Sequence, residues 1–169
     1  MTPRTQPKLA MRPMLPADVP LLAEIFRASI GELTSEDYSE AQQEAWVSVA
    51  EDEGDFGARL AGELTLVATY DGAAVGFAAL AGNKEIDMLY VHPAAAGQGV
   101  GAMLCDALEK LAAARGTKEL TVDASDTARG FFEKRGFQAR QRNTFTLAGE
   151  WVANTTMSKT LTPEKGTLQ

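Results

Sequence analysis

Three glycines, Gly97, Gly99 and Gly101, alternate with other residues directly before a stretch whose apolar residues recur at helical spacing. A glycine loop at a helix N-terminus can aim several backbone N–H groups at one point, where the helix dipole adds partial positive charge. These residues therefore predict an anion site, most often one for phosphate. Glu85 and Asp87 lie just upstream, and alternation along a strand would place both on one side. A carboxylate there could accept a proton from a nucleophile.

The elements around the loop are the clearest in the chain. Glu85–Val91 is rich in strand-forming residues, and the pattern of apolar residues from Val100 onward predicts an amphipathic helix that Gly116 ends. Leu120–Val122 is the next buried strand. Because a helix lies between the two strands, we expect them to run parallel.

The rest of the chain alternates between strands and helices. The other expected strands are Leu9–Met14, Leu64–Tyr70, Ala74–Leu80, Thr144–Leu147 and Val152–Lys159, and the other expected helices are one that Asp18 caps, one over Ser39–Ala50, one over Phe56–Leu60 and one that Asp126 caps and Gly136 ends. The Asp71–Gly72 turn makes a hairpin of its two flanking strands. This order predicts an α/β fold with a mixed sheet covered by helices.

Composition narrows the class of protein. The 169 residues suffice for one domain, 1–169, with polar tails at 1–8 and 163–169 that we expect to be flexible. A net charge of −7 argues against a nucleic-acid surface. No apolar run reaches about 18 residues and the N-terminus lacks a signal-peptide core, so we expect no membrane partner and a cytoplasmic location. One cysteine, Cys105, and one histidine, His92, argue against a disulfide and a conventional zinc site.

Two generic interpretations of the glycine loop compete with a specific one. Gly97-x-Gly99-x-x-Ala102 matches the dinucleotide fingerprint, with Glu119 and Asp123 near the required acidic position. The segment His92–Ala96 separates the strand from this loop, however, whereas the dinucleotide loop follows its strand directly. The glycines could also serve only a tight turn and close helix packing.

The third interpretation rests on two motifs in the same order and at the right separation. The segment from Leu89 to Leu104 resembles motif A of the GNAT (GCN5-related N-acetyltransferase) superfamily, whose core is [Q/R]-x-x-G-x-[G/A]. The segment from Ala128 to Phe137 resembles motif B, A-x-x-F-Y-x-x-x-G-F. The resemblance is strong over Leu64–Phe137 and looser at both ends, where the chain is similar to uncharacterised bacterial members.

The resemblance implies a fold, a donor and a reaction. It implies a single-domain mixed sheet of about six or seven strands, splayed at its central parallel pair and flanked by helices. It further implies that acetyl-CoA is the acyl donor, without a metal, and that acetyl passes to a primary amine of a small molecule or peptide by direct attack in a ternary complex. A homodimer is possible in this superfamily. The alternative is an acyl-CoA-binding or sensor module without catalysis.

The implied site residues follow from the motifs. The predicted coenzyme A contacts are Leu89, Tyr90, Val91, Gly97, Gln98, Gly99, Val100, Gly101, Ala102, Ser125 and Phe132, and the predicted general bases are Glu85 and Asp87. Pyrophosphate would lie on the loop amides, and the N–H of Val91 or a neighbour would polarise the thioester carbonyl.

The chain departs from the motifs at two positions. Ala96 stands where the family has Gln or Arg, which weakens the anion site without removing its backbone donors. Phe132 stands where many members have a tyrosine that protonates the leaving thiolate, so the general acid is left unassigned. Both departures favour the sensor alternative.

Other residues carry open alternatives. Tyr38 and Trp46 could line an acceptor pocket or belong to the core. Tyr90 is expected to pack on the face opposite Asp87, and could act as an acid only if a bulge rotates it. Asn154, Thr155 and Thr156 could face an acceptor or be ordinary strand residues, His92 could lie near the phosphates or on the surface, and Cys105 is expected to be structural.

Overall fold

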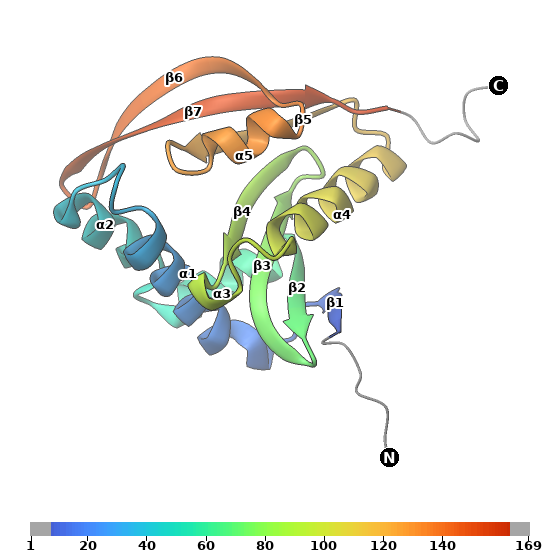
Figure 1. The fold of residues 1–169 in the computed structure, drawn as a ribbon, viewed down its shortest axis with the longest axis horizontal. Helices are drawn as coiled ribbons and strands as arrows, with labels where there is room; N and C mark the ends of the chain where they lie inside the picture. Colours follow the sequence, from blue (N-terminus) through green and yellow to red (C-terminus); the bar gives the residue numbers. More distant parts are fainter. Residues whose placement is uncertain (1–7, 163–169) are drawn as a thin grey trace.

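The computed structural model describes residues 8–162, which form one seven-stranded sheet with helices on both faces (Figure 1). The sheet order is β1-β2-β3-β4-β5-β7-β6. The strands are Leu9–Pro13 (β1), Leu64–Tyr70 (β2), Ala73–Ala81 (β3), Glu85–Val91 (β4), Glu119–Ser125 (β5), Gln138–Leu147 (β6) and Glu150–Thr160 (β7). The α-helices are Val19–Leu33 (α1), Glu40–Val47 (α2), Glu53–Ala61 (α3), Val100–Ala114 (α4) and Arg129–Lys134 (α5), with 3-10 turns at Pro16–Asp18 (η1), Ser48–Ala50 (η2) and Pro93–Ala95 (η3).

The central pair of strands, β4 and β5, is parallel and short. Only Glu85 with Thr121 and Ile86 with Val122 are paired, although both strands continue well beyond these residues. The other neighbouring strands pair antiparallel along most of their length. The sheet therefore divides into two halves that separate after Val122, as the predicted fold class requires, and Figure 1 shows β4 turning away from β5, β6 and β7.

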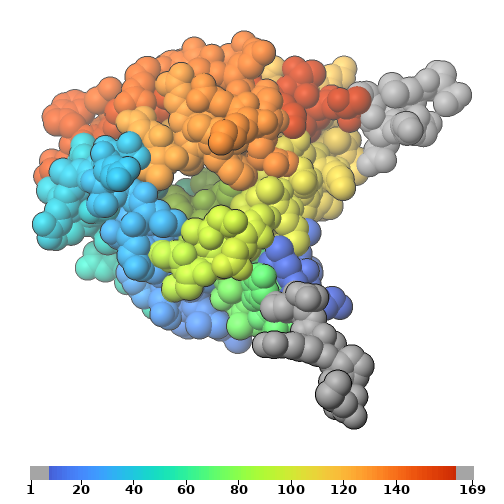
Figure 2. Space-filling view, viewed as in Figure 1, coloured from blue at the N-terminus to red at the C-terminus, as the bar shows by residue number. Residues whose placement is uncertain are grey.

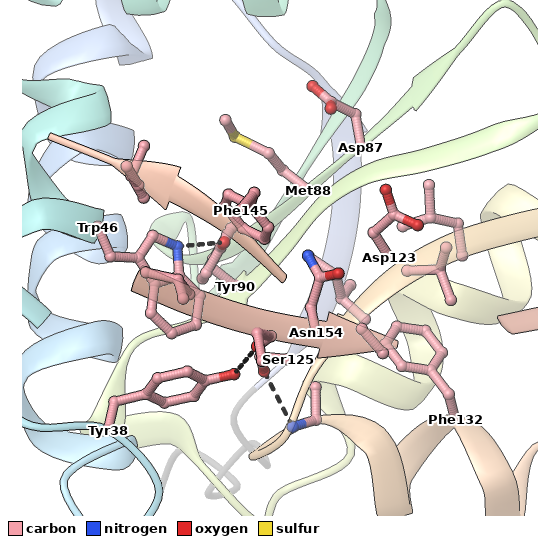
Figure 3. Close-up of a pocket in the computed structure, with 18 of the residues that line it drawn as sticks. Tyr38, Trp46, Asp87, Met88, Tyr90, Asp123, Ser125, Phe132, Phe145 and Asn154 are labelled. Carbon is pink, nitrogen blue, oxygen red and sulfur yellow. Dashed lines mark hydrogen bonds between the residues drawn. The ribbon is translucent and has the colours of Figure 1, made fainter. Parts of the chain in front are cut away.

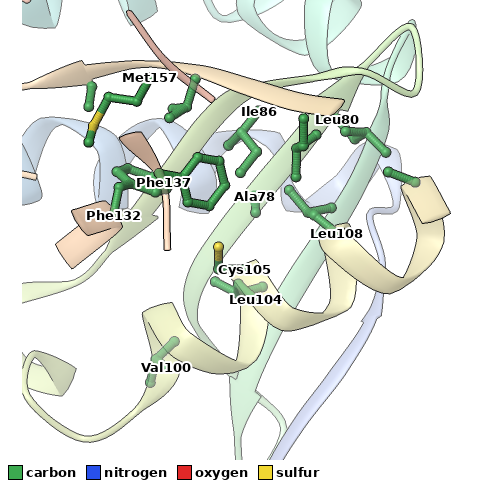
Figure 4. Packing of buried hydrophobic residues seen from close by; sticks show 14 of the residues in the cluster. Ala78, Leu80, Ile86, Val100, Leu104, Cys105, Leu108, Phe132, Phe137 and Met157 are labelled. Carbon is green, nitrogen blue, oxygen red and sulfur yellow. The ribbon is translucent and has the colours of Figure 1, made fainter. Parts of the chain in front are cut away.

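Apolar side chains hold the two halves together. Leu104 and Leu108 of α4 pack in one buried cluster with Ile86 of β4, Leu120 of β5 and Met157 of β7 (Figure 4). A second cluster on the opposite face joins α1 and α3 to β2, β3 and β4. The first cluster spans the two separating strands. Burial of its apolar surface therefore stabilises the contact between the two halves where backbone hydrogen bonds between β4 and β5 are absent.

A β-bulge at Asp87 changes which way β4 faces. Ala79 is opposite Met88 and Leu80 is opposite Ile86, so Asp87 is an extra residue without a partner in β3. Ile86 consequently packs in the α4 cluster, whereas Met88 packs on the α1 side. Simple alternation, on which the expected faces of the β4 side chains rested, does not hold across this strand.

Two helix starts in the first half of the chain differ from the prediction in part. The helix expected from Phe56 begins at Glu53, because the Asp52 side chain accepts a hydrogen bond from Asp55 N at 3.0 Å and acidic residues favour a first turn. Asp18 occupies the N-cap position of α1 as predicted, but its side chain makes no capping hydrogen bond there, because the carboxylate instead binds Arg12.

The start of α5 also differs from the prediction, because Asp126 does not cap this helix. Ser125 Oγ accepts the hydrogen bond from Ala128 N at 3.1 Å, while the Asp126 carboxylate pairs with Arg142 of β6. The two last strands also begin earlier than predicted, at Gln138 and Glu150.

The predicted tails lie almost wholly outside the described residues. Lys8 is the exception, and its backbone N–H donates to Asp71 Oδ1 at 2.7 Å. Within residues 8–162, no helix is long and apolar enough to cross a membrane.

Candidate active site

Two cavities meet where β4 and β5 separate. The first, of about 250 Å³, is lined by charged and apolar side chains from α2, α3 and the β6–β7 hairpin as well as from β4 and β5 (Figure 3). The second, of about 230 Å³, is lined by residues of α1, β4, α4 and α5. Both include Trp46, Leu89, Tyr90, Ser125, Ala128 and Phe132. Figure 2 shows the surface hollowed between the orange carboxyl-terminal part and the blue and yellow-green parts. A molecule in the second cavity could thus touch a molecule in the first through the opening in the sheet.

The glycine loop lies beside the second cavity. Gly97 and Gly99 have positive φ angles, 77 and 84 degrees respectively, and L side chains rarely adopt such a backbone conformation. The first hydrogen bond of α4 runs from Met103 N to Gly99 O at 3.0 Å, and among the described residues the N–H groups of Val100 and Gly101 have no backbone acceptor. The loop conformation thus leaves donors at the positive end of α4, which is the chemistry of an anion site.

Asp87 lines the first cavity and binds Arg59 through both carboxylate oxygens. Arg59 Nε lies 2.9 Å from Oδ2 and Nη2 lies 2.8 Å from Oδ1. Burial alone would raise the Asp87 pKa, but the hydrogen bonds and the positive charge of Arg59 outweigh it and lower the pKa. Asp87 is therefore a well-fixed carboxylate at the wall of the cavity.

Glu63 lies in the turn between α3 and β2, four residues after Arg59. Burial raises the Glu63 pKa to about 7, and the negative charge of Asp87 adds to that effect. Its Oε1 is buried and has no hydrogen-bond partner among the described residues. Glu63 does not line either cavity, so any contact with a bound molecule would pass through Asp87.

Glu85, the other predicted base, also lies outside both cavity linings. Burial raises its pKa, and the charges of Asp123 and Asp87 add to that effect. Its role stays a prediction.

A chain of polar side chains borders the first cavity on the β5–β7 side. Thr156 Oγ1 donates to Asp123 Oδ1 at 2.6 Å, and Asn143 Nδ2 lies 2.8 Å from Thr156 Oγ1 and 2.9 Å from Asn154 Oδ1. Asp123 and Asn154 at the two ends of this chain line the cavity, while Thr155 is buried. The network therefore holds one carboxylate and one amide at the wall of the cavity.

The aromatic residues form the shared wall of the two cavities. Trp46 Nε1 donates to the Tyr90 hydroxyl at 3.2 Å (Figure 3). Burial raises the Tyr90 pKa to about 12. Tyr90 and Asp87 both line the first cavity, so the expectation that they occupy opposite faces is wrong, and the bulge is the reason. Tyr38 also lines that cavity, and its hydroxyl accepts from Asp126 N and donates to Ala153 O.

The other predicted contacts divide into two groups. Leu89, Tyr90, Val91, Gly101, Ser125 and Phe132 line one or both cavities, whereas Gly97, Gln98, Gly99, Val100 and Ala102 form the adjoining loop and helix start. Their role in binding coenzyme A stays a prediction.

Neither His92 nor Cys105 lines either of these cavities. His92 Nδ1 accepts the hydrogen bond from Ala94 N that starts η3. Cys105 is fully buried, and burial together with Glu109 raises its pKa to about 12. Its thiol is therefore not a nucleophile at neutral pH.

Comparison with known proteins identifies this arrangement. The family model for the acetyltransferase (GNAT) domain matches residues 34–161. The chain belongs to the GNAT acetyltransferase family. The uncharacterised N-acetyltransferase YafP of Escherichia coli K12 is 34% identical over 146 residues, which are 86% of this chain and 92% of that protein. The chain is thus an acetyl-CoA-dependent N-acetyltransferase by family.

Solved structures agree with this assignment. A GCN5-related N-acetyltransferase from Rhodopseudomonas palustris is 59% identical, with a TM-score of 0.89 over 95% of this chain and 99% of that one. The PaiA N-acetyltransferase of Thermoplasma acidophilum, solved with coenzyme A, shares the GNAT fold at 23% identity and a TM-score of 0.74, covering 90% of this chain and 99% of its own.

Sequence reasoning missed two residues of the site, Arg59 and Glu63. Arg59 lies in the last turn of α3 and Glu63 follows the end of that helix, and no spacing rule connects either residue to β4. The sequence indicates Asp123 only as a dinucleotide ligand, because its place on the cavity depends on how far β5 separates from β4.

Proposed function

We propose that this GNAT protein transfers acetyl from acetyl-CoA to a compact primary amine that binds in the first cavity. The observation that carries the proposal is the meeting of the two cavities between β4 and β5. In the proposed complex the pyrophosphate lies on the N–H groups around Gly99, and the pantetheine arm follows the second cavity past Val91 and Phe131. Its thioester then reaches the opening beside Tyr90.

The charges of the first cavity support an ammonium group on the acceptor. Its charged lining residues are Arg59, Asp87 and Asp123, and the positive charge of Arg59 is paired with Asp87. Asp123 then supplies a negative charge that no arginine or lysine offsets within the described residues. Phe145 and Leu147 supply an apolar wall for the body of the molecule.

The proposed chemistry is direct attack. The ammonium loses one proton to Asp87, and the amine lone pair attacks the thioester carbonyl carbon, whose oxygen a backbone N–H near Val91 polarises. The C–N bond forms and the C–S bond breaks. Tyr90 is the proposed proton donor to the leaving thiolate, since its phenol lines both cavities and Phe132 has no proton to give. The second nitrogen proton then replaces the one that Tyr90 gives up.

The test combines donor binding and turnover. Isothermal titration should show that acetyl-CoA binds and that NAD does not, and thiol release with a panel of primary amines should identify acceptors. Initial rates at several acetyl-CoA and amine concentrations should give intersecting double-reciprocal lines, the mark of a ternary complex. Parallel lines would instead indicate an acetyl-enzyme, and binding without thiol release would favour the acyl-CoA-binding module.

A further inference from the structure

A chain of three hydrogen bonds joins the carboxylate of Asp123 to the amide of Asn154, and its donors and acceptors can be assigned. Thr156 Oγ1 lies 2.6 Å from Asp123 Oδ1. Because an ionised carboxylate only accepts, the single hydroxyl proton of Thr156 is donated to Asp123. Thr156 Oγ1 can then only accept from Asn143, whose Nδ2 lies 2.8 Å away. The Asn143 side chain therefore presents its NH2 group, and not its carbonyl oxygen, to both neighbours.

The same NH2 group decides how the Asn154 amide is oriented. Asn143 Nδ2 lies 2.9 Å from Asn154 Oδ1, so the Asn154 oxygen accepts from a donor within the sheet. Asn154 Nδ2 donates to no protein group within residues 8–162, and it is not among the buried atoms that lack a partner. Since Asn154 lines the first cavity, its two N–H bonds are open to a molecule bound there (Figure 3). Asn154 is thus a fixed hydrogen-bond donor on the cavity wall.

The strands place this donor between the reacting end and the apolar end of the first cavity. Asp87 and Asp123 each follow the last paired residue of their strand, so they lie where β4 and β5 separate. Asn154 is two residues closer to the β6–β7 turn than the partner of Asp123 in β7. Phe145, opposite Val152, lies beyond it. A molecule whose ammonium lies between the two carboxylates therefore meets the Asn154 donor next and apolar side chains after that.

We propose that the acceptor amine carries an uncharged oxygen close to its amino group, a hydroxyl or an amide carbonyl, and that Asn154 recognises this oxygen. The inference rests on the proposed function, because it takes the ammonium end of the acceptor as the end that reacts. A molecule that fills the cavity displaces water from Asn154 Nδ2, and an oxygen on that molecule restores the lost hydrogen bond. A hydrocarbon at the same place leaves the donor unpaired. Asn154 is therefore a specificity-determining residue.

The charges of the cavity disfavour a carboxylate at that position. Among the lining residues that the structure describes, only Arg59 is cationic, and Asp87 binds it through both carboxylate oxygens. A carboxylate beside Asn154 would meet no free positive charge and would be repelled by Asp123. Amino alcohols and amino-acid amides therefore fit the cavity better than free amino acids do.

A pair of amines of equal size tests the recognition. 2-Aminoethanol carries a hydroxyl where propylamine carries a methyl group. Thiol release from acetyl-CoA gives the ratio of kcat/KM for 2-aminoethanol to that for propylamine. Asn154→Leu should lower this ratio about tenfold relative to the wild type, which is the effect of one lost hydrogen bond. The different basicities of the two amines cancel in this comparison, and an unchanged ratio would overturn the inference.

Two further variants distinguish recognition from a general loss of packing. Asn154→Asp keeps the size of the side chain but removes the donor, so it should lower the same ratio even where Asn154→Leu does not fold. Asn143→Leu alters no residue of the cavity lining. It should still lower the ratio, though by less, because the Asn154 amide can then present either end; an unchanged ratio would contradict the orienting role of Asn143. The matched control Gln141→Leu removes an exposed amide from the same strand and should keep the wild-type ratio.

Glycine and glycinamide test whether the oxygen must be uncharged. Glycine carries a carboxylate where glycinamide carries an amide of the same size. Asp123→Asn should raise the ratio of kcat/KM for glycine to that for glycinamide about tenfold, because the like-charge repulsion is removed. A ratio that stays at the wild-type value would overturn the discrimination against carboxylates.

A binding measurement by NMR needs no turnover. In the complex with coenzyme A, which has no acetyl group to transfer, the side-chain NH2 resonances of Asn154 are identified by their absence in Asn154→Asp. 2-Aminoethanol should shift these resonances, and propylamine at the same concentration should shift them much less. Equal shifts, or none, would overturn the inference. Selective shifts in a protein that acetylates no amine would instead refute the proposed function while leaving the oxygen site in place.

Discussion

Asp123 is a single side chain on which acceptor preference can be tested. Its carboxylate accepts a hydrogen bond from Thr156 and lines the first cavity, where Arg59 is engaged by Asp87. We expect Asp123→Asn to raise KM for a cationic amine about tenfold, or ~1.4 kcal/mol of binding, because an amide retains the hydrogen bond but lacks the charge. Values of kcat should change little. The control Glu119→Gln removes a charge from the exposed start of the same strand and should leave KM unaltered.

Tyr90 is the residue whose position depends most on the bulge at Asp87. Its hydroxyl accepts from Trp46 and lies at the wall that both cavities share. If this phenol protonates the leaving thiolate, Tyr90→Phe should lower kcat about tenfold or more while KM for acetyl-CoA stays constant, because ring packing against Phe26 and Phe77 is retained. Tyr70→Phe, a matched removal of a hydroxyl elsewhere on the sheet, should be silent in the same steady-state assay. An unchanged kcat in Tyr90→Phe would mean that solvent, and not Tyr90, protonates the leaving thiolate.

At the scale of elements, variants of the glycine loop can distinguish a loss of stability from a loss of ligand binding. Gly99 and Gly72 have nearly equal positive φ angles, and a Cβ at either position would meet nothing within 4 Å. Gly99→Ala and Gly72→Ala should therefore both lose about 1 kcal/mol of stability from the strained φ. Only Gly99→Ala should weaken acetyl-CoA binding, because its strain is relieved by moving the N–H groups at the start of α4. Calorimetry that finds equal affinities for the two variants would contradict the proposed cradle.

The same elements show which parts of the fold and of the site can be predicted from the sequence. The glycine loop, the helix over Val100–Ala114 and the antiparallel strands before it follow from local patterns, and the structure has them as predicted. The face presented by Tyr90 does not follow, because a bulge depends on pairing with β3 and leaves no mark in the β4 sequence. Arg59 reaches Asp87 only because α3 packs in the buried cluster that also includes Met88 of β4, so this half of the site is a product of tertiary structure.

At the scale of the whole molecule, the two half-sheets share only a short parallel pairing and an apolar core. Beyond Ile86 and Val122, β4 is hydrogen-bonded on its β3 side alone, so its other edge can pair with a ligand. Bound acetyl-CoA should slow amide hydrogen exchange about tenfold in residues 88–91, since a pantetheine arm in the gap would supply partners that β5 does not. The β2–β3 hairpin, already paired along its length, should exchange at the same rate with and without the donor. NAD added at the same concentration should protect neither segment. Protection of the hairpin but not of residues 88–91 would place the donor outside the opening between the two halves.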